Sequence, residues 1–440
     1  MCWLTGRSLS PVGKNWRLNS KTKATPLGIA NKVPSEFRIS NKEIRMLKEL
    51  RKKAEADFKA NGFPSTKEEL WRFTDVSRVA NAEFSNEWKE ASVDFQPLDK
   101  IVVVFENGKL SREKSNFGDL PKGVCIGSIM DLVDPRIGSL ADAQSAFVSA
   151  NTAYFTDGAF IEVTDGVEVD TPIHLVYLAD ADGAAFHMRN FISAGVGSKV
   201  TVVEEYIGET EKNYWTNAVT EVFVADRGSV DHYKVQRESA ASFHFQTLEA
   251  HVGADAVFSN HAVTFGSALG RNDIRGKLTG EGGEAICNGI YLLKDKQHFD
   301  THMFMDHAVP KCNSHEMYKG ILDDKARAVF CGRILVQKDA QETDAIQFNG
   351  NLLLSRGAKV NTLPQLEIYA DDVKCTHGAT IGELDDVELY YLQTRGIDPV
   401  KGHAMLTFAF ANEVLDEVKC KVVKIKIEDL VHAWLEKVSA

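Results

Sequence analysis

The chain has 440 residues, of which 44% are hydrophobic and 26% are charged, values that are typical of a soluble globular protein. No stretch approaches the ~18 uncharged apolar residues that a membrane span requires, so no transmembrane helix is predicted. The formal net charge is -11. An acidic body argues against nucleic-acid binding, because neutralising phosphates requires a clustered positive face.

Residues 1–35 differ from the remainder of the chain in charge. They contain arginine, lysine, serine and threonine, but no acidic residue. They also lack the apolar segment of a secretory signal, so their composition favours an organelle transit peptide. A disordered basic leader is the alternative interpretation.

The cysteines lie far apart in the sequence and form no CxxC pair. This spacing argues against a disulfide framework, a zinc ribbon or a self-contained cluster site. A reducing compartment is the simplest interpretation.

Residues 36–98 are predicted to form an N-terminal helical domain. Ser40 and Glu43 have the spacing of a capping box. A run of apolar residues at helical spacing follows: Ile44, Leu47, Leu50, Ala54 and Phe58. The Asn-Gly-Phe-Pro segment 61–64 ends this helix, and the segment 65–69 is predicted to begin a second, shorter helix. The aromatic-rich segment 70–74 is typical of a seam where a helix docks onto the body of a protein.

Residues 99–380 are dominated by short β-rich runs separated by glycine-containing turns. No proline lies between Pro172 and Pro310, which suits continuous ladders in which each residue donates its backbone N–H. No helical period of useful length interrupts the runs, so a sheet of βαβ units is disfavoured. A sandwich, a barrel and a β-helix remain. The region is too long for one ordinary sandwich, so we predict a β-helix core of stacked strands.

Residues 381–440 are predicted to form a C-terminal helical domain. The first helix covers 384–395 and ends at Gly396. Asp398 is expected to cap a second helix that begins with proline, and a last short helix is predicted over 428–438. The second helix is apolar on more than one face, so part of its surface is expected to pack within the chain and part to meet a partner.

The densest group of metal-ligand residues lies in the segment 298–307. On a strand, His298, Asp300 and His302 share one face, and two histidines with one carboxylate can hold iron. The first and last of these residues span about 13 Å on a straight strand, however, so they cannot all reach one ion without a bend. A polar outer face or a subunit interface is the preferred interpretation, and a metalloenzyme is the alternative.

Cys375 and His377 form a second candidate site, late in the β-rich region. If the segment is extended, both side chains project from the same face, and both are ligand types for iron and zinc. Considered alone, a buried thiol beside a hydrogen-bonded histidine is the preferred interpretation.

No nucleotide is expected to bind this chain. The segment 270–278 resembles a phosphate loop, but it has one residue too many and lacks the Ser or Thr that would bind magnesium. Neither a GxGxxG after a strand nor a GxSxG elbow is present. The chain is therefore predicted not to be an enzyme by itself.

Several motifs resemble the SufD branch of the SufB/SufD family, which belongs to the SUF machinery for iron–sulfur cluster assembly. The resemblance covers about residues 40–440, and the run Pro364–Thr380 is its most specific part, closer to SufD than to SufB. The other matching stretches are 61–64, 69–74, 306–310, 317–320, 351–355 and 389–396.

This resemblance implies a mainly β protein, with a right-handed parallel β-helix core flanked by N-terminal and C-terminal α-helical domains. It implies a heterodimer with a SufB-type paralogue and a SufC-type ABC ATPase bound to the C-terminal helices. The residues expected to bind that ATPase are Tyr390, Tyr391, Arg395, Phe408 and Phe410.

The resemblance also implies a role for the second candidate site. His377, with Cys375 beside it, would lie at the interface with the SufB-type partner and share a transient iron–sulfur cluster with it. Our hypothesis for the mechanism is that the partner ATPase binds and hydrolyses ATP, that its dimerisation twists the two β-helices against each other, and that their interface then opens. The acid-free leader, in a relative of this family, points to the plastid (chloroplast) stroma. A structural adapter in which Cys375 and His377 are inert is the remaining alternative.

Overall fold

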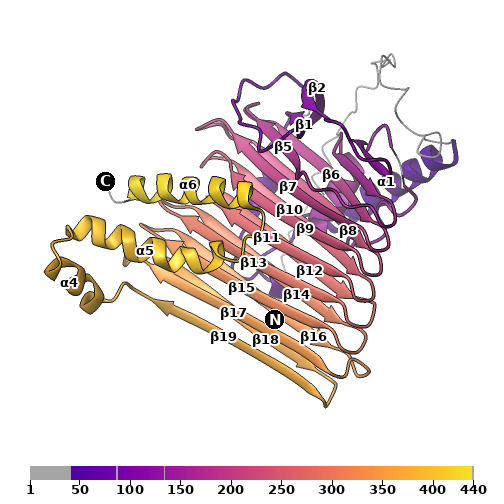
Figure 1. Cartoon of the computed structure of the whole chain (residues 1–440). Helices are drawn as coiled ribbons and strands as arrows, with labels where there is room; N and C mark the ends of the chain where they lie inside the picture. Colours follow the sequence, from indigo (N-terminus) through magenta and orange to yellow (C-terminus); the bar gives the residue numbers. More distant parts are fainter. Residues whose placement is uncertain (1–40, 86–87, 133, 439–440) are drawn as a thin grey trace, which may run out of the picture. The chain divides into compact units, whose positions relative to one another are not determined.

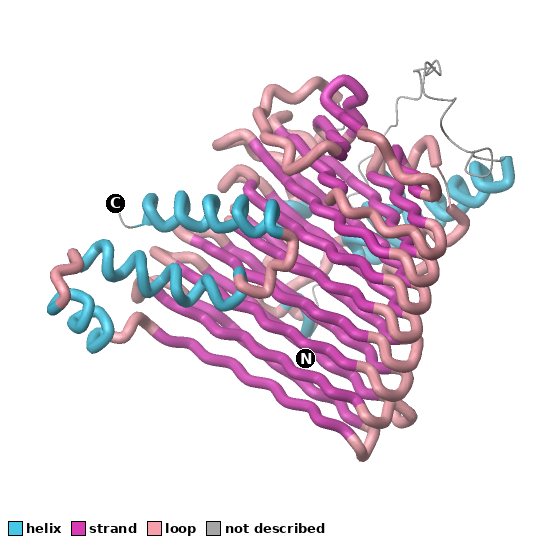
Figure 2. Tube along the Cα trace, in the orientation of Figure 1, coloured by secondary structure: helices cyan, strands magenta, loops and turns pink. Residues whose placement is uncertain are grey.

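The computed structural model describes residues 41–85, 88–132 and 134–438. The predicted transit peptide and the predicted capping residue Ser40 lie outside these residues. The core is a parallel β-helix, with helices before and after it (Figures 1 and 2). The prediction of a parallel β-helix with helices at both ends is thus confirmed. No helix in the described ranges is long and apolar enough to cross a membrane.

The strands of the β-helix form two sheets that face each other. From β4 onward, successive strands alternate between the sheets, so each pair of strands makes one turn. The ten-stranded sheet contains β1 (Ile101–Glu106), β2 (Lys109–Asn116), β5 (Ile173–Ala179), β7 (Lys199–Gly208), β9 (Ser229–Arg237), β11 (Val257–Thr264), β13 (Glu284–Leu293), β15 (Asn313–Leu322), β17 (Thr343–Leu353) and β19 (Val373–Gly382).

The nine-stranded sheet makes the opposite wall. It contains β3 (Val124–Ser128), β4 (Ala159–Val163), β6 (Ala185–Ala194), β8 (Trp215–Val224), β10 (Phe243–Val252), β12 (Leu269–Leu278), β14 (His298–His307), β16 (Arg327–Val336) and β18 (Lys359–Ile368). The pairs β1–β2 and β3–β4, at the N-terminal end of the sheets, are antiparallel. The other pairs within both sheets are parallel and in register.

The turns that lead from the nine-stranded to the ten-stranded sheet repeat one backbone device. Seven of the eight turns, all except the β18–β19 turn, have one residue with positive φ: Gly166, Gly197, Arg227, Asp255, Gly282, Lys311 and Glu342. In most of them this residue donates its N–H to the next turn, as Arg227 does to Ala254 O at 2.7 Å and Lys311 to Gln341 O at 2.9 Å. The stacked hydrogen bonds offset the strain of the left-handed conformation, which is of order 1 kcal/mol for a residue with a Cβ.

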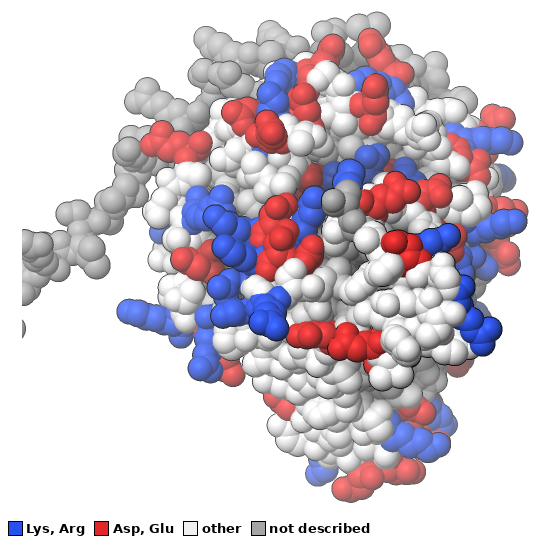
Figure 3. All heavy atoms as spheres, turned by 90° about the vertical axis from the view of Figure 1, so that its left-hand side faces the viewer, with Lys and Arg blue, Asp and Glu red and all other residues white. Residues whose placement is uncertain are grey.

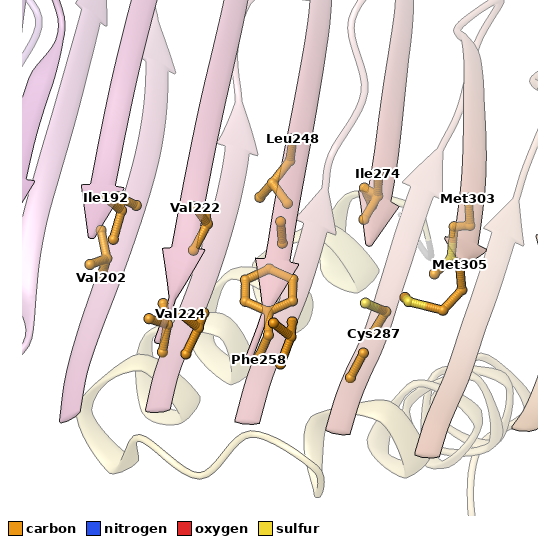
Figure 4. Close-up of a cluster of buried hydrophobic side chains, with 14 of the residues drawn as sticks. Ile192, Val202, Val222, Val224, Leu248, Phe258, Ile274, Cys287, Met303 and Met305 are labelled. Carbon is orange, nitrogen blue, oxygen red and sulfur yellow. The ribbon is translucent and has the colours of Figure 1, made fainter. Parts of the chain in front are cut away.

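Apolar side chains from both sheets fill the interior of the β-helix. Val202, Phe258 and Cys287 of the ten-stranded sheet face Val222, Leu248 and Met303 of the other (Figure 4). Alternate residues of each strand point inward, as the two-residue period of a strand requires. The core therefore runs along the stack of turns.

The N-terminal helices pack on the outside of the nine-stranded sheet. α1 (Asn41–Asn61) precedes the short helices η2 (Glu69–Trp71) and α2 (Ser77–Ala80). The second helix, predicted to begin within 65–69, is only the short 3-10 helix η2, which begins at Glu69 after a turn at 66–67. The predicted docking seam at 70–74 is confirmed by Trp71, which stacks on Phe147 with ring centroids 5.2 Å apart.

One helix interrupts the β-rich region, contrary to prediction. α3 (Ala146–Tyr154) is buried on nearly all sides, so its sequence has no polar face that would show a helical period. Asn151 fastens it to the sheet by donating to Met188 O and Asn217 O at 2.7 and 2.9 Å.

The C-terminal helices return over the outer face of the ten-stranded sheet (Figure 1). α4 (Asp386–Thr394) and α5 (Pro399–Leu415) lie close to their predicted positions, and the Asp398 side chain caps α5 by accepting from Val400 N at 2.9 Å. α6 (Lys421–Val438) begins seven residues before the predicted start at 428. Residues 423–427 alternate between Val or Ile and Lys, a period typical of a strand. In the structure the segment is helical, because Val423 and Ile427 both pack against the sheet and this contact stabilises the helix.

Candidate functional site

Cys375 and His377 lie on β19, the last strand of the ten-stranded sheet. β19 pairs with β17 along one edge, and no described strand pairs with its other edge. The register aligns Cys375 with Ala345 and His377 with Gln347 of β17. Both candidate residues therefore sit at the free end of the β-helix.

The register also shows the direction in which each side chain points. In-register pairing stacks equivalent residues in columns, and His377 ends the column Cys287–Glu316–Gln347–His377. Cys287 points into the interior (Figure 4), so this whole column is inward-facing. Cys375 is inward-facing too, and it packs against the core.

The two residues differ in exposure although they share a face. Cys375 is half-buried, whereas His377 is exposed. Burial raises the pKa of the Cys375 thiol, and the nearby Asp344 carboxylate raises it further. Cys375 is therefore a thiol at neutral pH, and it becomes a good ligand only when a metal ion displaces its proton.

Two ligands do not complete a metal site. Among the described residues, no group of three or more His, Cys, Asp or Glu side chains is placed to hold a metal ion. Iron and zinc sites in proteins normally use three or four protein ligands. An ion at Cys375 and His377 would need further ligands from another molecule.

The inward column beneath His377 is polar, and sequence reasoning missed it. The Gln347 side chain donates from Nε2 to Glu316 Oε2 at 2.6 Å. Both residues are almost fully buried, and burial raises the pKa of Glu316 to about 7 although the bond from Gln347 opposes the rise. Single polar residues in separate strands carry no local motif, and only the register of the strands brings them together.

The second group of ligand residues has a structural role. Asp300 accepts from Thr74 Oγ1 at 2.6 Å and from Arg271 at 3.0 Å, and His302 Nε2 lies 3.1 Å from Asp300 Oδ1. Thr74 also lies 3.1 Å from His298 Nε2. The group thus fastens the segment that contains η2 to the nine-stranded sheet. The group lies on the polar outer face of the sheet, as predicted, but the N-terminal segment covers it, so that it forms a seam within the chain.

Electrostatics reinforce this interpretation. Burial lowers the pKa of His302, but the Asp300 carboxylate outweighs this effect and raises the pKa to about 9. His302 is then protonated at neutral pH, with a proton on each ring nitrogen, and has no lone pair for a metal. The guanidinium of Arg271, 3.9 Å from the ring centroid of Trp71, adds a cation–π contact to the seam.

The predicted partner-binding residues of the C-terminal helices fall into two sets. Tyr390 and Tyr391 on α4 are 68% and 56% exposed, and Arg395 donates to Tyr391 Oη at 2.9 Å. Phe408 and Phe410 instead pack within the chain. Phe408 stacks on His432 with centroids 4.1 Å apart, and Lys319 Nζ lies 4.2 Å from the ring centroid of Phe410.

Exposed apolar residues of the C-terminal helices lie at Val422 and Ile425 of α6 and, in larger number, on α4 and the first half of α5. Those on α4 and α5, besides the two tyrosines, are Val387, Val400 and Met405. On the side of the molecule that carries these helices, acidic and basic residues are interspersed and a broad uncharged area lies in the lower half of the view (Figure 3).

Comparison with known proteins is consistent with this arrangement. Residues 177–410 match the SufBD core domain of the SUF system for FeS cluster assembly, and residues 35–175 match the SufBD protein N-terminal region. An iron–sulfur cluster assembly SufBD family protein of Synechocystis is 32% identical over 381 residues, which cover 81% of this chain and 84% of that protein.

Two further relatives extend the comparison. The iron–sulfur cluster assembly protein SufD of Escherichia coli is 31% identical over 377 residues, covering 83% of this chain and 88% of SufD. The chloroplastic protein ABCI7 of Arabidopsis thaliana is 29% identical over 435 residues, which cover 93% of this chain and 90% of ABCI7. With a family match over more than half of its length and its β-helix in place, the chain belongs to the SufB/SufD family of iron–sulfur cluster assembly proteins.

Proposed function

We propose that this chain is a SufD-type subunit of an iron–sulfur cluster assembly complex. In this proposal it pairs with a SufB-type paralogue through the open end of its β-helix and recruits a SufC-type ABC ATPase through its C-terminal helices. The nascent cluster, which is the cargo of the complex, is built where Cys375 and His377 meet the paralogue.

The observation that carries the proposal is the open end of the β-helix. Ile368 and Ile381 occupy inward-facing positions of the last turn, as the register with Val336 and Asn351 shows. They are nevertheless 38% and 52% exposed, because no described segment forms a further turn over them. Solenoids normally end in a polar cap, and a free strand edge with exposed apolar residues is a surface that favours pairing with another chain.

A SufB-type paralogue is the partner that best fits this end. A chain with a similar β-helix could place its own last strands against β18 and β19 and bury the exposed apolar residues. Ligands from the paralogue would then complete the site begun by His377 and Cys375. A neutral imidazole suits a temporary ligand, because it holds iron without the strong bridging of a thiolate.

The exposed tyrosines of α4 support the proposed ATPase docking. Tyr390 and Tyr391 offer large rigid side chains, which are enriched among residues that dominate binding energy. Only residues 383–385 separate β19 from α4. A movement of α4 driven by the bound ATPase would therefore reach the strand that carries His377, and could open the interface between the two β-helices.

Two observations support a plastid location for the complex. The Arabidopsis relative is chloroplastic by its name, and the N-terminal segment of this chain has the composition of a transit peptide. We therefore place the complex in the plastid stroma.

Reconstitution of the complex tests the proposal. The chain is purified with SufB-type and SufC-type partners, supplied with iron, sulfide and ATP, and cluster formation is followed by visible absorption. His377→Ala is expected to lower the cluster yield at least tenfold without changing complex assembly. His315→Ala removes an exposed histidine from the outer face of β15 and serves as the matched control. An unchanged yield in His377→Ala would instead favour the inert structural adapter.

A further inference from the structure

Gln347 occupies an unusual position directly below the candidate site. Its side chain is 1% exposed, and its Nε2 donates to Glu316 Oε2 at 2.6 Å. Its other polar atom, Oε1, is buried and has no hydrogen-bond partner within the described part of the chain. A buried acceptor without a donor is destabilising because it has lost its hydrogen bonds to water, so the amide oxygen is a vacant acceptor inside the β-helix.

Two neighbours hold the amide of Gln347 in place. Glu316 lies beneath it in the column and offers an acceptor oxygen whether or not its carboxyl group is protonated. Gly332 of β16 lies against its flank, where an added Cβ would come within 2.3 Å of Nε2 and 2.6 Å of Oε1. Only a residue without a side chain leaves this space, so the amide group is fixed from two directions.

His377 is the neighbour that can supply the missing donor. It is the next inward residue of the same column, paired in register with Gln347. Neighbouring strands are about 4.8 Å apart, so stacked side chains of this length lie within hydrogen-bond reach of each other. A neutral imidazole has one N–H to donate and one nitrogen with a lone pair.

We propose that Gln347, held by Glu316 and Gly332, is a positioning residue: its vacant Oε1 accepts the ring N–H of His377 when that exposed ring turns inward from its orientation in the structure. This bond selects one tautomer of His377, orients the ring, and leaves the lone pair of the other nitrogen directed out of the β-helix. Histidine ligands of metals usually donate their second ring nitrogen to such a carbonyl or carboxylate oxygen. The role of His377 toward iron rests on the proposed function, whereas the hydrogen bond is a property of this chain alone.

Nuclear magnetic resonance of the full chain tests the bond without any partner. The histidine ring nitrogens are labelled with ¹⁵N, and the His377 signals are assigned by their loss in His377→Ala. At about pH 8, above the usual histidine pKa, the wild-type chain is expected to show a several-fold excess of one tautomer. Gln347→Met, which keeps the shape of the side chain but removes the acceptor, is expected to shift the ratio toward that of a free imidazole.

Two further variants serve as a control and as an independent test of the position of the Gln347 amide. Gln365→Met changes an exposed glutamine of β18 in the same turn and is expected to leave the His377 tautomer ratio unchanged. Gly332→Ala keeps every polar group of the column but displaces the Gln347 amide, so it is expected to reduce the excess as well. A tautomer ratio that is the same in wild type, Gln347→Met and Gly332→Ala, all folded by circular dichroism, would overturn the proposal.

Cluster formation in the complex with the SufB-type and SufC-type partners gives the second readout. Loss of an outer hydrogen-bond partner of a metal ligand typically costs about 10–100-fold in affinity or activity, so Gln347→Met is expected to slow cluster formation at least tenfold. Failure of the proposed function would appear separately, as an unchanged yield in His377→Ala. Normal cluster formation in Gln347→Met, where His377→Ala abolishes it, would overturn the positioning role.

Discussion

The two ends of the β-helix are finished in opposite ways. At the N-terminal end, β1 is covered by the antiparallel strand β2, and apolar residues of the segment 117–126 pack against the core. The inward residues Ile101 and Phe105 of β1 are consequently 3% and 1% exposed. At the C-terminal end, Ile381 has an equivalent inward position on β19 and is 52% exposed.

This difference shows which end of the β-helix is covered by segments of the chain itself. Both ends have a free strand edge and inward apolar side chains, which favour association with other chains unless they are covered. Within the described residues, strands and loops of the chain cover the N-terminal end of the β-helix and leave its C-terminal end uncovered. The uncovered end also holds Cys375 and His377, so the surface proposed to bind a partner and the residues proposed for cluster assembly coincide.

The sharpest test compares one substitution in a middle turn with the same substitution in the last turn. Val230 is fully buried, and Val230→Asp is expected to lower the free energy of unfolding by about 4 kcal/mol or more, because it buries an unpaired charge. Ile381→Asp is expected to change it by about 0.5 kcal/mol at most, as is usual for an exposed site. Urea unfolding of the isolated chain measures both.

Ile381→Asp should have its effect on association instead. The variant is expected to lose binding to the SufB-type paralogue in size-exclusion chromatography, while Leu70→Asp, at another exposed apolar residue, should bind normally. If Ile381→Asp destabilised the chain as much as Val230→Asp, the last turn would be covered and the contrast between the two ends would be wrong.

A smaller effect is expected at the C-terminal helices. Tyr390→Ala should weaken binding of the SufC-type ATPase by about 2 kcal/mol, roughly 30-fold in affinity, because an exposed tyrosine at an interface often contributes this much. Calorimetric titration of the isolated chain with the ATPase measures the change. Val422→Ala on α6 is the control, and equal binding by wild type and Tyr390→Ala would place the docking surface elsewhere.

The smallest effect concerns how firmly the N-terminal segment is fastened. The folded-state pKa of His302 is raised to about 9, above the usual value of about 6.5. Its contribution to stability is therefore fully present below pH 6.5 and is lost as the pH rises through 9. We expect a loss of about 1–2 kcal/mol over this range in the wild type relative to His302→Gln, measured by urea unfolding at several pH values. Parallel curves for the two proteins would show that the pair of His302 and Asp300 adds no pH-dependent stability.

Local patterns were sufficient to predict the β-helix and the caps of the C-terminal helices. The strands are regular, and Asp398 before a proline is a strong local signal for a helix start. Residues 65–69, α3 and the start of α6 were mispredicted because tertiary contacts decide their structure. In four of the seven repeated turns the left-handed position is held by Arg, Asp, Lys or Glu, so no glycine marks that position in the sequence.

The candidate site was only partly accessible to sequence reasoning. Cys375 and His377 lie two residues apart and attract attention together. Glu316 and Gln347 are separated from them by a whole turn or more of the β-helix, and only the strand register places them in the same column. The group at His298, Asp300 and His302 had the residue types of a metal site, but Thr74, which lies far away in the sequence, shows that it is a seam.

The path of α5 and α6 has a consequence for the order of folding. A solenoid forms by addition of neighbouring turns, each of which contacts only the turns beside it. α6 contacts strands many turns before its own position, for example through Lys426 and Glu205 of β7. The C-terminal helices can therefore dock only after several consecutive turns have assembled. Once docked, they connect turns that would otherwise fold and unfold locally, so that these turns behave as one cooperative unit. A chain that has failed to complete its middle turns would leave these helices undocked, which gives a quality-control protease a direct means of distinguishing unfinished molecules from finished ones.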